Sequence, residues 1–171
     1  NVFALESDRE QSVLVEAEEV EMDFNSGVRI YRGNVSVEQG TIRIIADEIQ
    51  LFYKGEQLDH AIAKGDPAIF RQRPDNKDHD IVGTGQTIKL DEINNLVTFL
   101  DNARLRQDRD SIEGEKIVYD MARDRMIVRG TKDMPTLTKR SDKNSKDNIT
   151  GSRPRLSIQP NQENDASSTL T

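Results

Sequence analysis

A short pattern of residues recurs four times along this chain of 171 residues and restricts its fold more than any other feature. Each copy has a small residue, two polar residues, and then two apolar residues separated by one other residue. The copies begin at Ala17, Ala46, Gly85 and Gly114. Repeats with a period of about 20 to 50 residues indicate structural units that stack on one another and share a continuous apolar interior. We therefore expect an elongated structure built from similar units.

The alternation of apolar and polar residues predicts that these units consist of strands. Ile42 and Ile44 flank one polar residue, and so do Ile88 and Leu90. This period of two places one side of a strand in an apolar interior and the other side in water. Val and Ile, which favour strands, supply 26 of the 58 hydrophobic residues, and no segment shows an apolar stripe at helical spacing. The sequence predicts an all-β fold of many short antiparallel strands.

Hydrophobic residues are distributed unevenly, because 51 of the 58 lie in residues 1–131. The later residues cannot bury enough apolar surface to offset the entropy of ordering, except where Leu156 and Ile158 alternate with polar residues before Pro160. At the other end, Asn1–Ala4 ends in a small-x-small pattern that fits the remnant of a signal-peptidase site. We divide the chain into an N-terminal segment (1–9), a folded β domain (10–137), a polar flexible linker (138–152), a terminal strand (153–160) and a disordered tail (161–171).

Composition excludes several classes of protein. The chain has no cysteine, which excludes disulfides, thiolate metal sites and a cysteine nucleophile. It has no apolar run near the ~20 residues that a membrane-spanning helix needs. Its formal net charge is −7, with no basic face, so we expect no nucleic acid partner.

No set of residues indicates catalysis, and we predict that the chain is not an enzyme and uses no cofactor or metal. The two histidines, His60 and His79, both fall in segments expected to be polar turns, and no second cluster of metal ligands accompanies them. Glu18 and Glu19 fit the solvated face of a strand better than the acid pair of a glycosidase. A carbohydrate-active β-helix enzyme is therefore the weakest of the functions considered.

The alternating apolar residues are candidates for the lining of one shared interior. Because each unit contributes similar residues, successive positions would bind an apolar chain with similar free energy, and such a chain could slide along them. The alternative is an ordinary closed and dry core, which the same alternation also predicts. The candidate lining residues are Val13, Val15, Val20, Met22, Val35, Val37, Ile42, Ile44, Ile49, Leu51, Phe70, Ile88, Leu90, Leu105, Ile117 and Tyr119.

A stack of strands that does not close on itself leaves two edges with unpaired backbone groups. Joining unlike edges by strand addition extends the stack, which would give a filament or a bridge. Trimming residues 153–171 is therefore expected to weaken self-association. The candidate edge residues are Ser12, Val13, Leu14, Val15, Glu16 and Ala17 at the first strand, and Arg155, Leu156, Ser157, Ile158 and Gln159 at the last.

These segments together carry a resemblance to a known family. Residues 13–38 (VLVEAEEVEMDFNSGVRIYRGNVSVE) resemble the OstA-like repeat of the periplasmic lipopolysaccharide transport protein A (LptA/OstA-like) family. Further similar stretches are residues 39–44 (QGTIRI), 65–68 (GDPA) and 112–120 (IEGEKIVYD). The resemblance covers about residues 10–131 and the segment ending at Pro160.

The resemblance implies an elongated, half-open antiparallel β-jellyroll in the periplasm of a Gram-negative bacterium. It further implies an apolar groove that shields the acyl chains of lipopolysaccharide. The implied partners are other copies joined head to tail, an inner-membrane-anchored member of the transport system and an outer-membrane member. The competing function is a structural adaptor that uses its strand edges for assembly and has no lipid site.

Overall fold

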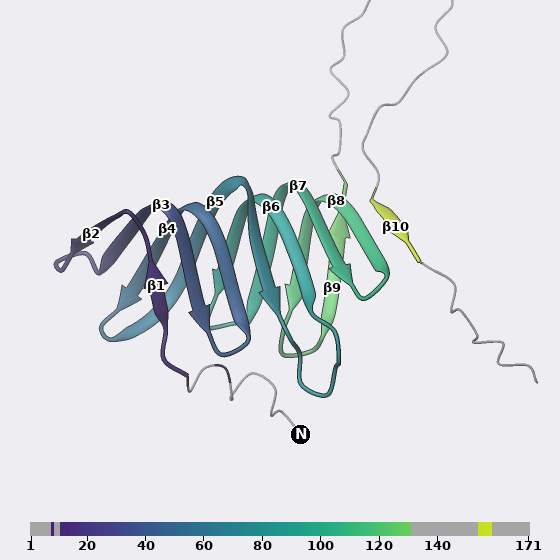
Figure 1. Ribbon diagram of the computed structural model, residues 1–171, viewed down its shortest axis with the longest axis horizontal. Coiled ribbons are helices and arrows are strands. Elements are labelled where there is room, and N and C mark those ends of the chain that lie inside the picture. The colour runs from purple at the N-terminus through teal and green to yellow at the C-terminus, as the bar shows by residue number, and fades with distance from the viewer. Residues whose placement is uncertain (1–7, 9–10, 131–153, 159–171) are drawn as a thin grey trace, which may run out of the picture.

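The computed structural model describes residue 8, residues 11–130 and residues 154–158, and these form ten strands in one antiparallel sheet (Figure 1). The predicted all-β antiparallel fold is confirmed. The predicted linker 138–152, the predicted tail 161–171 and the edge residue Gln159 lie outside the described residues. The strands are β1 (Leu14–Glu16), β2 (Glu19–Asp23), β3 (Val28–Gln39), β4 (Ile42–Lys54), β5 (Gln57–Gln72), β6 (Ile81–Asp91), β7 (Leu96–Gln107), β8 (Asp110–Asp120), β9 (Arg125–Arg129) and β10 (Arg155–Ser157).

The six strands β3 to β8 pair in chain order. The first and last of them, β3 and β8, each pair with two short strands as well. β1 and β2 pair with different halves of β3, while β10 and β9 pair with different halves of β8. Figure 1 shows the long strands side by side along the length of the molecule, with β1 and β2 at one end and β9 and β10 at the other. The sheet therefore ends in two short strands on each side.

Every pair of neighbouring long strands has a break in register at a corresponding place. A β-bulge bends its strand, so aligned bulges fold the whole sheet along one line, which we call the crease. One half of the sheet, the β1–β10 wall, contains β1, β10 and residues 35–39, 42–45, 69–72, 81–84, 104–107 and 110–113. The other, the β2–β9 wall, contains β2, β9 and residues 28–32, 48–54, 57–64, 87–91, 96–100 and 116–120. The breaks lie between Arg32 and Val35, Ile45 and Glu48, Lys64 and Ala68, Thr84 and Thr87, and Leu100 and Ala103.

The crease explains the small residue that opens each copy of the repeat. Ala46, Gly85 and Gly114 all lie on it, where the two walls meet and little space is left for a side chain. A Cβ atom at Gly85 would lie 2.7 Å from the Leu100 carbonyl oxygen, and one at Gly114 would lie 2.7 Å from Val128 Cγ1. Each of these copies of the sequence repeat therefore begins where a strand crosses the crease.

The repeat also fixes the turns of three hairpins. An aspartate stands six residues after the small residue in three copies, as Asp23, Asp91 and Asp120. Each carboxylate accepts a backbone hydrogen bond from the following turn, over 2.9 Å from Asn25, 2.9 Å from Asn94 and 3.0 Å from Arg123. Such hydrogen bonds from the turn backbone to an aspartate stabilise the turn in which one strand ends and the next begins in the opposite direction.

The two walls face each other across an apolar interior. On the β1–β10 wall, one row of paired residues runs through Ile44, Phe70, Gly83 and Leu105. On the β2–β9 wall, the facing row runs through Ile49, Ala63, Ile88, Phe99 and Ile117. The rings of Phe70 and Phe99 meet edge to face with their centroids 5.9 Å apart, which brings the two walls into contact.

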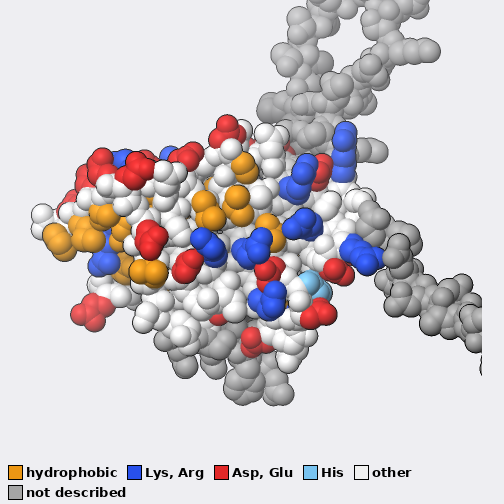
Figure 2. Space-filling view, in the orientation of Figure 1, with side chains coloured by type: hydrophobic (Ala, Val, Ile, Leu, Met, Phe, Trp, Pro, Cys, Tyr) orange, Lys and Arg blue, Asp and Glu red, His pale blue; other side chains and the backbone are white. Residues whose placement is uncertain are grey.

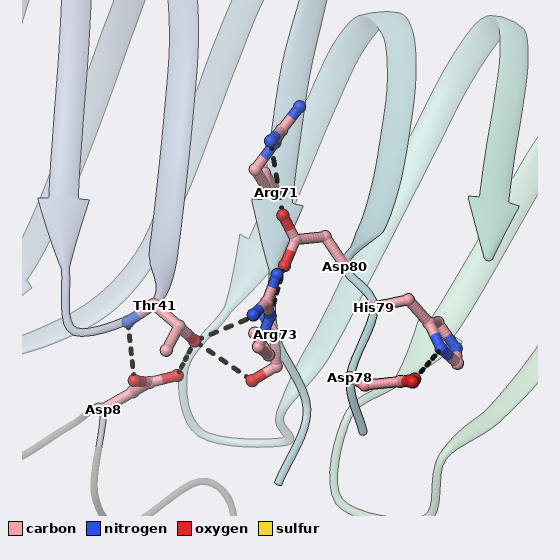
Figure 3. A network of polar contacts seen from close by, with 7 residues as sticks. All are labelled: Asp8, Thr41, Arg71, Arg73, Asp78, His79 and Asp80. Atoms are coloured by element: carbon pink, nitrogen blue, oxygen red, sulfur yellow. Dashed lines mark hydrogen bonds and ion pairs between the residues drawn. The ribbon is translucent and has the colours of Figure 1, made fainter. Parts of the chain in front are cut away.

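Opposite the crease, the free ends of the strands form a rim on each wall. On the β1–β10 rim, the β3–β4 turn contacts both Asp8 and the loop 73–80 (Figure 3). The Thr41 backbone N–H and hydroxyl donate to the two carboxylate oxygens of Asp8, each over 2.8 Å, and the hydroxyl accepts from the Arg73 backbone N–H over 3.3 Å. The side chain of Arg73 in turn donates to Asp80 over 2.8 Å.

The loop 73–80 also reaches the other rim. Lys77 donates to the carboxylate of Asp124 over 2.8 Å, and Asp124 lies in the turn between β8 and β9. The second oxygen of Asp124 accepts from the Tyr119 hydroxyl over 2.9 Å. This contact, which we call the latch (Lys77, Asp124 and Tyr119), connects the two walls on the side opposite the crease.

Candidate functional site

An apolar cavity of about 410 Å³ lies between the two walls, in the part of the molecule near β1. This volume is within the range of about 300–1,000 Å³ that is typical of small-molecule sites. Strands β3 to β6 and the segment before β1 supply the wall residues. The lining consists of Val13, Val37, Gln39, Ile42, Ile44, Ile49, Leu51, Tyr53, Glu56, Gln57, Leu58, Ala61, Ala63, Ile88, Leu90 and Glu92.

Small side chains on β5 create this space. Ala61 and Ala63 point inward from the β2–β9 wall, between Leu51 and Ile49 on one side and Leu90 and Ile88 on the other. One strand further along, the corresponding positions of that wall carry the larger Leu90 and Ile88. A missing side chain in a packed interior leaves an empty volume unless the walls collapse onto it. The small side chains of the two alanines therefore leave the space that the cavity occupies.

The cavity is apolar inside and polar at its border. Gln39, Glu56, Gln57 and Glu92 belong to the turns and strand ends on the rims. Tyr53 is also at this border, and the guanidinium of Arg29 lies 4.1 Å from its ring centroid in a cation–π contact. An elongated molecule with an apolar chain and a polar head would find matching surroundings for both of its parts here.

The predicted lining residues fall into three groups in the structure. Eight of the sixteen line the cavity. Five are sealed in the core with at most 2% of their surface exposed, and three lie on or beside the short edge strands β1 and β2. The eight are Val13, Val37, Ile42, Ile44, Ile49, Leu51, Ile88 and Leu90; the five are Val35, Phe70, Leu105, Ile117 and Tyr119; the three are Val15, Val20 and Met22.

Four apolar lining residues were not predicted from the sequence. Ala61 and Ala63 alternate with larger residues on β5 and could have been found by extending the period-two pattern through that strand. Tyr53 continues the alternation of Ile49 and Leu51 on β4. Leu58 lies beyond a register shift on β5, where the pairing passes from Phe52 and His60 to Tyr53 and Leu58, and no local pattern marks it as inward-facing.

One expectation about a histidine is wrong. The sequence predicts a polar turn at His60, but His60 lies within β5, paired with Phe52 on β4. The imidazole stacks on the Phe52 ring with the centroids 4.2 Å apart, and its Nδ1 lies 2.7 Å from the Asp59 carboxylate. The polar sequence around His60 comes from the outward face of a strand. Its role in this structure is packing on the outer surface.

Apolar side chains are exposed where the interior reaches the first end of the stack. Val20 and Met22 pair with the inward-facing Tyr31 and Arg29, yet they are 47% and 45% exposed because no further strand covers them. Figure 2 shows hydrophobic side chains gathered at this end, over β2. The interior is therefore open at this end of the molecule.

At the other end, β9 and β10 form the edges. Met126 and Val128 of β9 pair with the inward-facing Tyr119 and Ile117 and are partly buried against the core. On β10, Leu156 is 60% exposed although it pairs with Ile112, which packs against the core. The predicted edge residues Leu14–Glu16 and Arg155–Ser157 thus form the short strands β1 and β10, at opposite ends of one wall.

The outward faces of the two edges on the β2–β9 wall carry opposite charges. β2 presents Glu19, Glu21 and Asp23 outward, and the Arg32 guanidinium lies between the first two, 3.1 Å and 2.9 Å from their carboxylates. The outward positions of β9 begin and end with arginines, at Arg125 and Arg129. The two ends of the stack are therefore electrostatically unlike.

The latch contains the most strongly perturbed ionisable group among the described residues. Burial, followed by the hydrogen bond to Asp124 and the negative charges of Asp124 and Asp120, raises the pKa of Tyr119 above its ordinary value. The hydrogen bond from Lys77 lowers the pKa of the Asp124 carboxyl. Both shifts favour a neutral hydroxyl beside a charged carboxylate at neutral pH.

Among the described residues, three or more side chains of the kinds that hold metal ions do not gather anywhere. Within those ranges there is also no helix of the length and hydropathy needed to cross a membrane.

Comparison with known proteins agrees with the geometry. The family described as LptA/(LptD N-terminal domain) LPS transport protein matches residues 14–125. The lipopolysaccharide export system protein LptH of Pseudomonas aeruginosa is 37% identical over 123 residues, which are 71% of this chain and 70% of that protein. LptA of Escherichia coli (strain K12) is 31% identical over 119 residues, which are 68% of this chain and 64% of that protein.

A solved structure has the same fold. The crystal structure of LptH, described as the LptA-homologous periplasmic component of the lipopolysaccharide transport device of Pseudomonas aeruginosa, superimposes with a TM-score of 0.74. The match covers 90% of this chain and 99% of that one, at 30% identity. The resemblance seen in the sequence is thereby confirmed, and this chain belongs to the LptA/LptD N-terminal domain family of lipopolysaccharide transport proteins.

Proposed function

We propose that this chain is a periplasmic lipopolysaccharide transport protein that shields acyl chains between its two walls. The observation that supports this most directly is the apolar cavity of about 410 Å³ with its polar border. Each methylene removed from water is worth about 0.8 kcal/mol, so a chain of about twelve carbons gains on the order of 10 kcal/mol from such shelter. The sugars and phosphates of the same lipid would remain outside, in water.

A photo-crosslinking residue tests the lipid site directly. Placed at Leu90, which lines the cavity, it is expected to label lipopolysaccharide. The matched control is Lys89, the next residue on β6, which is exposed on the outer face. Equal labelling from both positions, or labelling from Lys89 alone, would contradict a site between the walls.

We further propose that copies join head to tail, and that the same edges accept inner-membrane-anchored and outer-membrane members of the transport system. Each wall has eight strands in antiparallel order, counted through β3 to β8 with one short strand at either end. Because eight is even, the first and last strands of a wall run in opposite directions. A second copy placed end to end would thus meet the first with antiparallel strands on both walls at once.

The lengths and charges of the edge strands support this arrangement. β2 and β9 have five residues each, while β1 and β10 have three each. If the rows of the sheet continue across the joint, Arg125 faces Asp23 and Arg129 faces Glu19. Opposite charges at directly facing positions stabilise strand pairs, whereas like charges destabilise them.

A charge exchange tests this joint. Arg125→Glu combined with Arg129→Glu is expected to reduce self-association at least tenfold, because acidic residues would then face acidic residues. Glu19→Arg combined with Asp23→Arg in a second protein is expected to restore association with the first variant. Sedimentation of each variant alone and of the mixture provides the measurement, and equal association of all combinations would exclude the β2–β9 joint.

A further inference from the structure

The cavity ends abruptly although the apolar interior continues. Along the β1–β10 wall, the cavity residue Ile44 is followed by Phe70 on the next strand. Along the β2–β9 wall, the cavity residue Ile88 is followed by Phe99. Neither phenylalanine lines the cavity. The two rings therefore stand at the inner end of the cavity, one from each wall.

These rings fill the space between the walls. Both are 0% exposed, and they meet edge to face with their planes inclined by 68°. The tip of the Phe99 ring crosses the interior and rests on Gly83 of the opposite wall, where any Cβ atom would overlap it. We call this pair the aromatic barrier (Phe70 and Phe99).

Beyond the aromatic barrier, the side chains of the interior are closed off from solvent. Ile81, Leu105 and Ile117 follow it and are at most 1% exposed. On the cavity side, by contrast, the same row of the β2–β9 wall carries the small Ala63. An apolar chain that enters from the β1 end thus meets a solid obstacle at a fixed depth.

We infer that the aromatic barrier determines how many methylene groups of an acyl chain the cavity accepts, so that Phe99 sets chain-length specificity. This inference rests on the proposed lipid-binding function. Each methylene inside the cavity is worth about a fourfold increase in affinity. Affinity is expected to rise with chain length and then to reach a plateau, once further methylenes would have to pass the rings.

The test measures binding of saturated fatty acids from octanoate to stearate by displacement of a fluorescent fatty acid. The wild-type protein is expected to show the plateau, and Phe99→Ala is expected to move it toward longer chains. Phe99→Leu, which removes less volume and preserves more of the core, is expected to move it by a smaller amount. Thermal unfolding and circular dichroism show which variants are folded.

Ile117→Ala is the matched control. Ile117 is as buried as Phe99 and lies in the same row on the next strand, but it is separated from the cavity by the barrier. Its truncation is expected to lower stability while leaving the plateau at the wild-type chain length. If the wild-type protein shows no plateau, or if the plateau is unchanged in folded Phe99 variants, the inference about chain length is overturned while the proposed lipid site stands. A wild-type protein that binds none of the fatty acids would overturn the lipid site and the inference together.

Discussion

At the level of single residues, the size of one inward-facing side chain decides whether the interior is open. Ala63 on β5 and Phe99 on β7 occupy equivalent positions in one row of the β2–β9 wall, on either side of Ile88. The first leaves a cavity and the second fills the space up to the opposite wall. The same strand pattern thus produces a binding site in one part of the molecule and a solid core in the next.

Ala63→Leu is expected to fill the cavity and lower the affinity for fatty acids roughly tenfold or more, because the leucine occupies the place of several methylene groups. The free energy of unfolding is expected to change by no more than about 1.5 kcal/mol, since the added volume enters an existing space. Ile62→Leu, on the outward face of the same strand, is the control and should leave binding unchanged. Undiminished binding by Ala63→Leu would place the lipid elsewhere.

Sequence alone could predict the inward side of most strands, but not which inward residues border a cavity. Ile88 and Ile117 belong to copies of the same repeat and have the same pattern of neighbours along the chain. They differ in one of their partners across the strands, because Ile88 lies between Ala63 and Phe99, whereas Ile117 lies between Phe99 and Val128. Those pairings depend on register, and register depends on the bulges at the crease.

Tyr119 is expected to make stability fall at high pH. Its pKa is raised in the folded protein, so the unfolded chain loses the hydroxyl proton first, near the ordinary value of about 10. The contribution of Tyr119 is therefore complete below about pH 10 and is lost as the pH rises above it. Tyr119→Phe is expected to weaken this dependence in urea unfolding measured across that range. If stability decreases equally at alkaline pH in both proteins, the decrease comes from groups other than Tyr119.

At the level of elements, the loop 73–80 is more than a connection between β5 and β6. Its polar composition predicts a loop, and the structure agrees. Nothing in the sequence around Lys77, however, indicates a partner 47 residues away in the β8–β9 turn. That contact exists because the crease folds two distant turns to the same side of the molecule, which no local pattern reveals.

The latch is expected to contribute modestly to stability, because its ion pair is partly exposed. Lys77→Glu is expected to lower the free energy of unfolding by up to about 1 kcal/mol, and adding Asp124→Lys should recover most of the loss. Urea unfolding of the two single variants and the double variant gives the coupling. Additive effects would mean that Lys77 and Asp124 do not stabilise each other in solution.

Acid provides a second test of the latch. Because the pKa of Asp124 is lowered in the folded protein, its contribution is present above about pH 4 and is lost as the pH falls through the folded pKa. Lys77→Met removes the principal cause of the shift and is expected to reduce the difference in stability between neutral and acidic pH. If stability differs between neutral and acidic pH as much in Lys77→Met as in the wild type, the contact between Lys77 and Asp124 is not the source of the acid dependence.

At the level of the whole molecule, the proposed assembly combines apolar interiors with charged outer faces. Val20 and Met22 at one end would cover Met126 and Val128 of the next copy. The outer charges of β2 and β9 would lie at the surface of the joint, where salt screens them with a Debye length of about 10 Å at 0.1 M. Self-association is therefore expected to weaken, without disappearing, as sodium chloride is raised.

Sedimentation at increasing salt concentration measures this effect, with the Arg125→Glu, Arg129→Glu variant as the control. The variant lacks the attractive pairs and is expected to associate more strongly, or no less, when its repulsion is screened. The same salt dependence in both proteins would show that these arginines do not face acidic residues in the joint.

The even number of strands in each wall also limits which insertions and deletions of strands are compatible with the proposed assembly. Deleting or inserting a whole hairpin preserves the alternation of strand directions, and both ends still match their neighbours. Gain or loss of a single strand would reverse the polarity of one end and leave it facing a parallel partner. Relatives that polymerise in the proposed manner should therefore differ in length by pairs of strands, in increments of one hairpin.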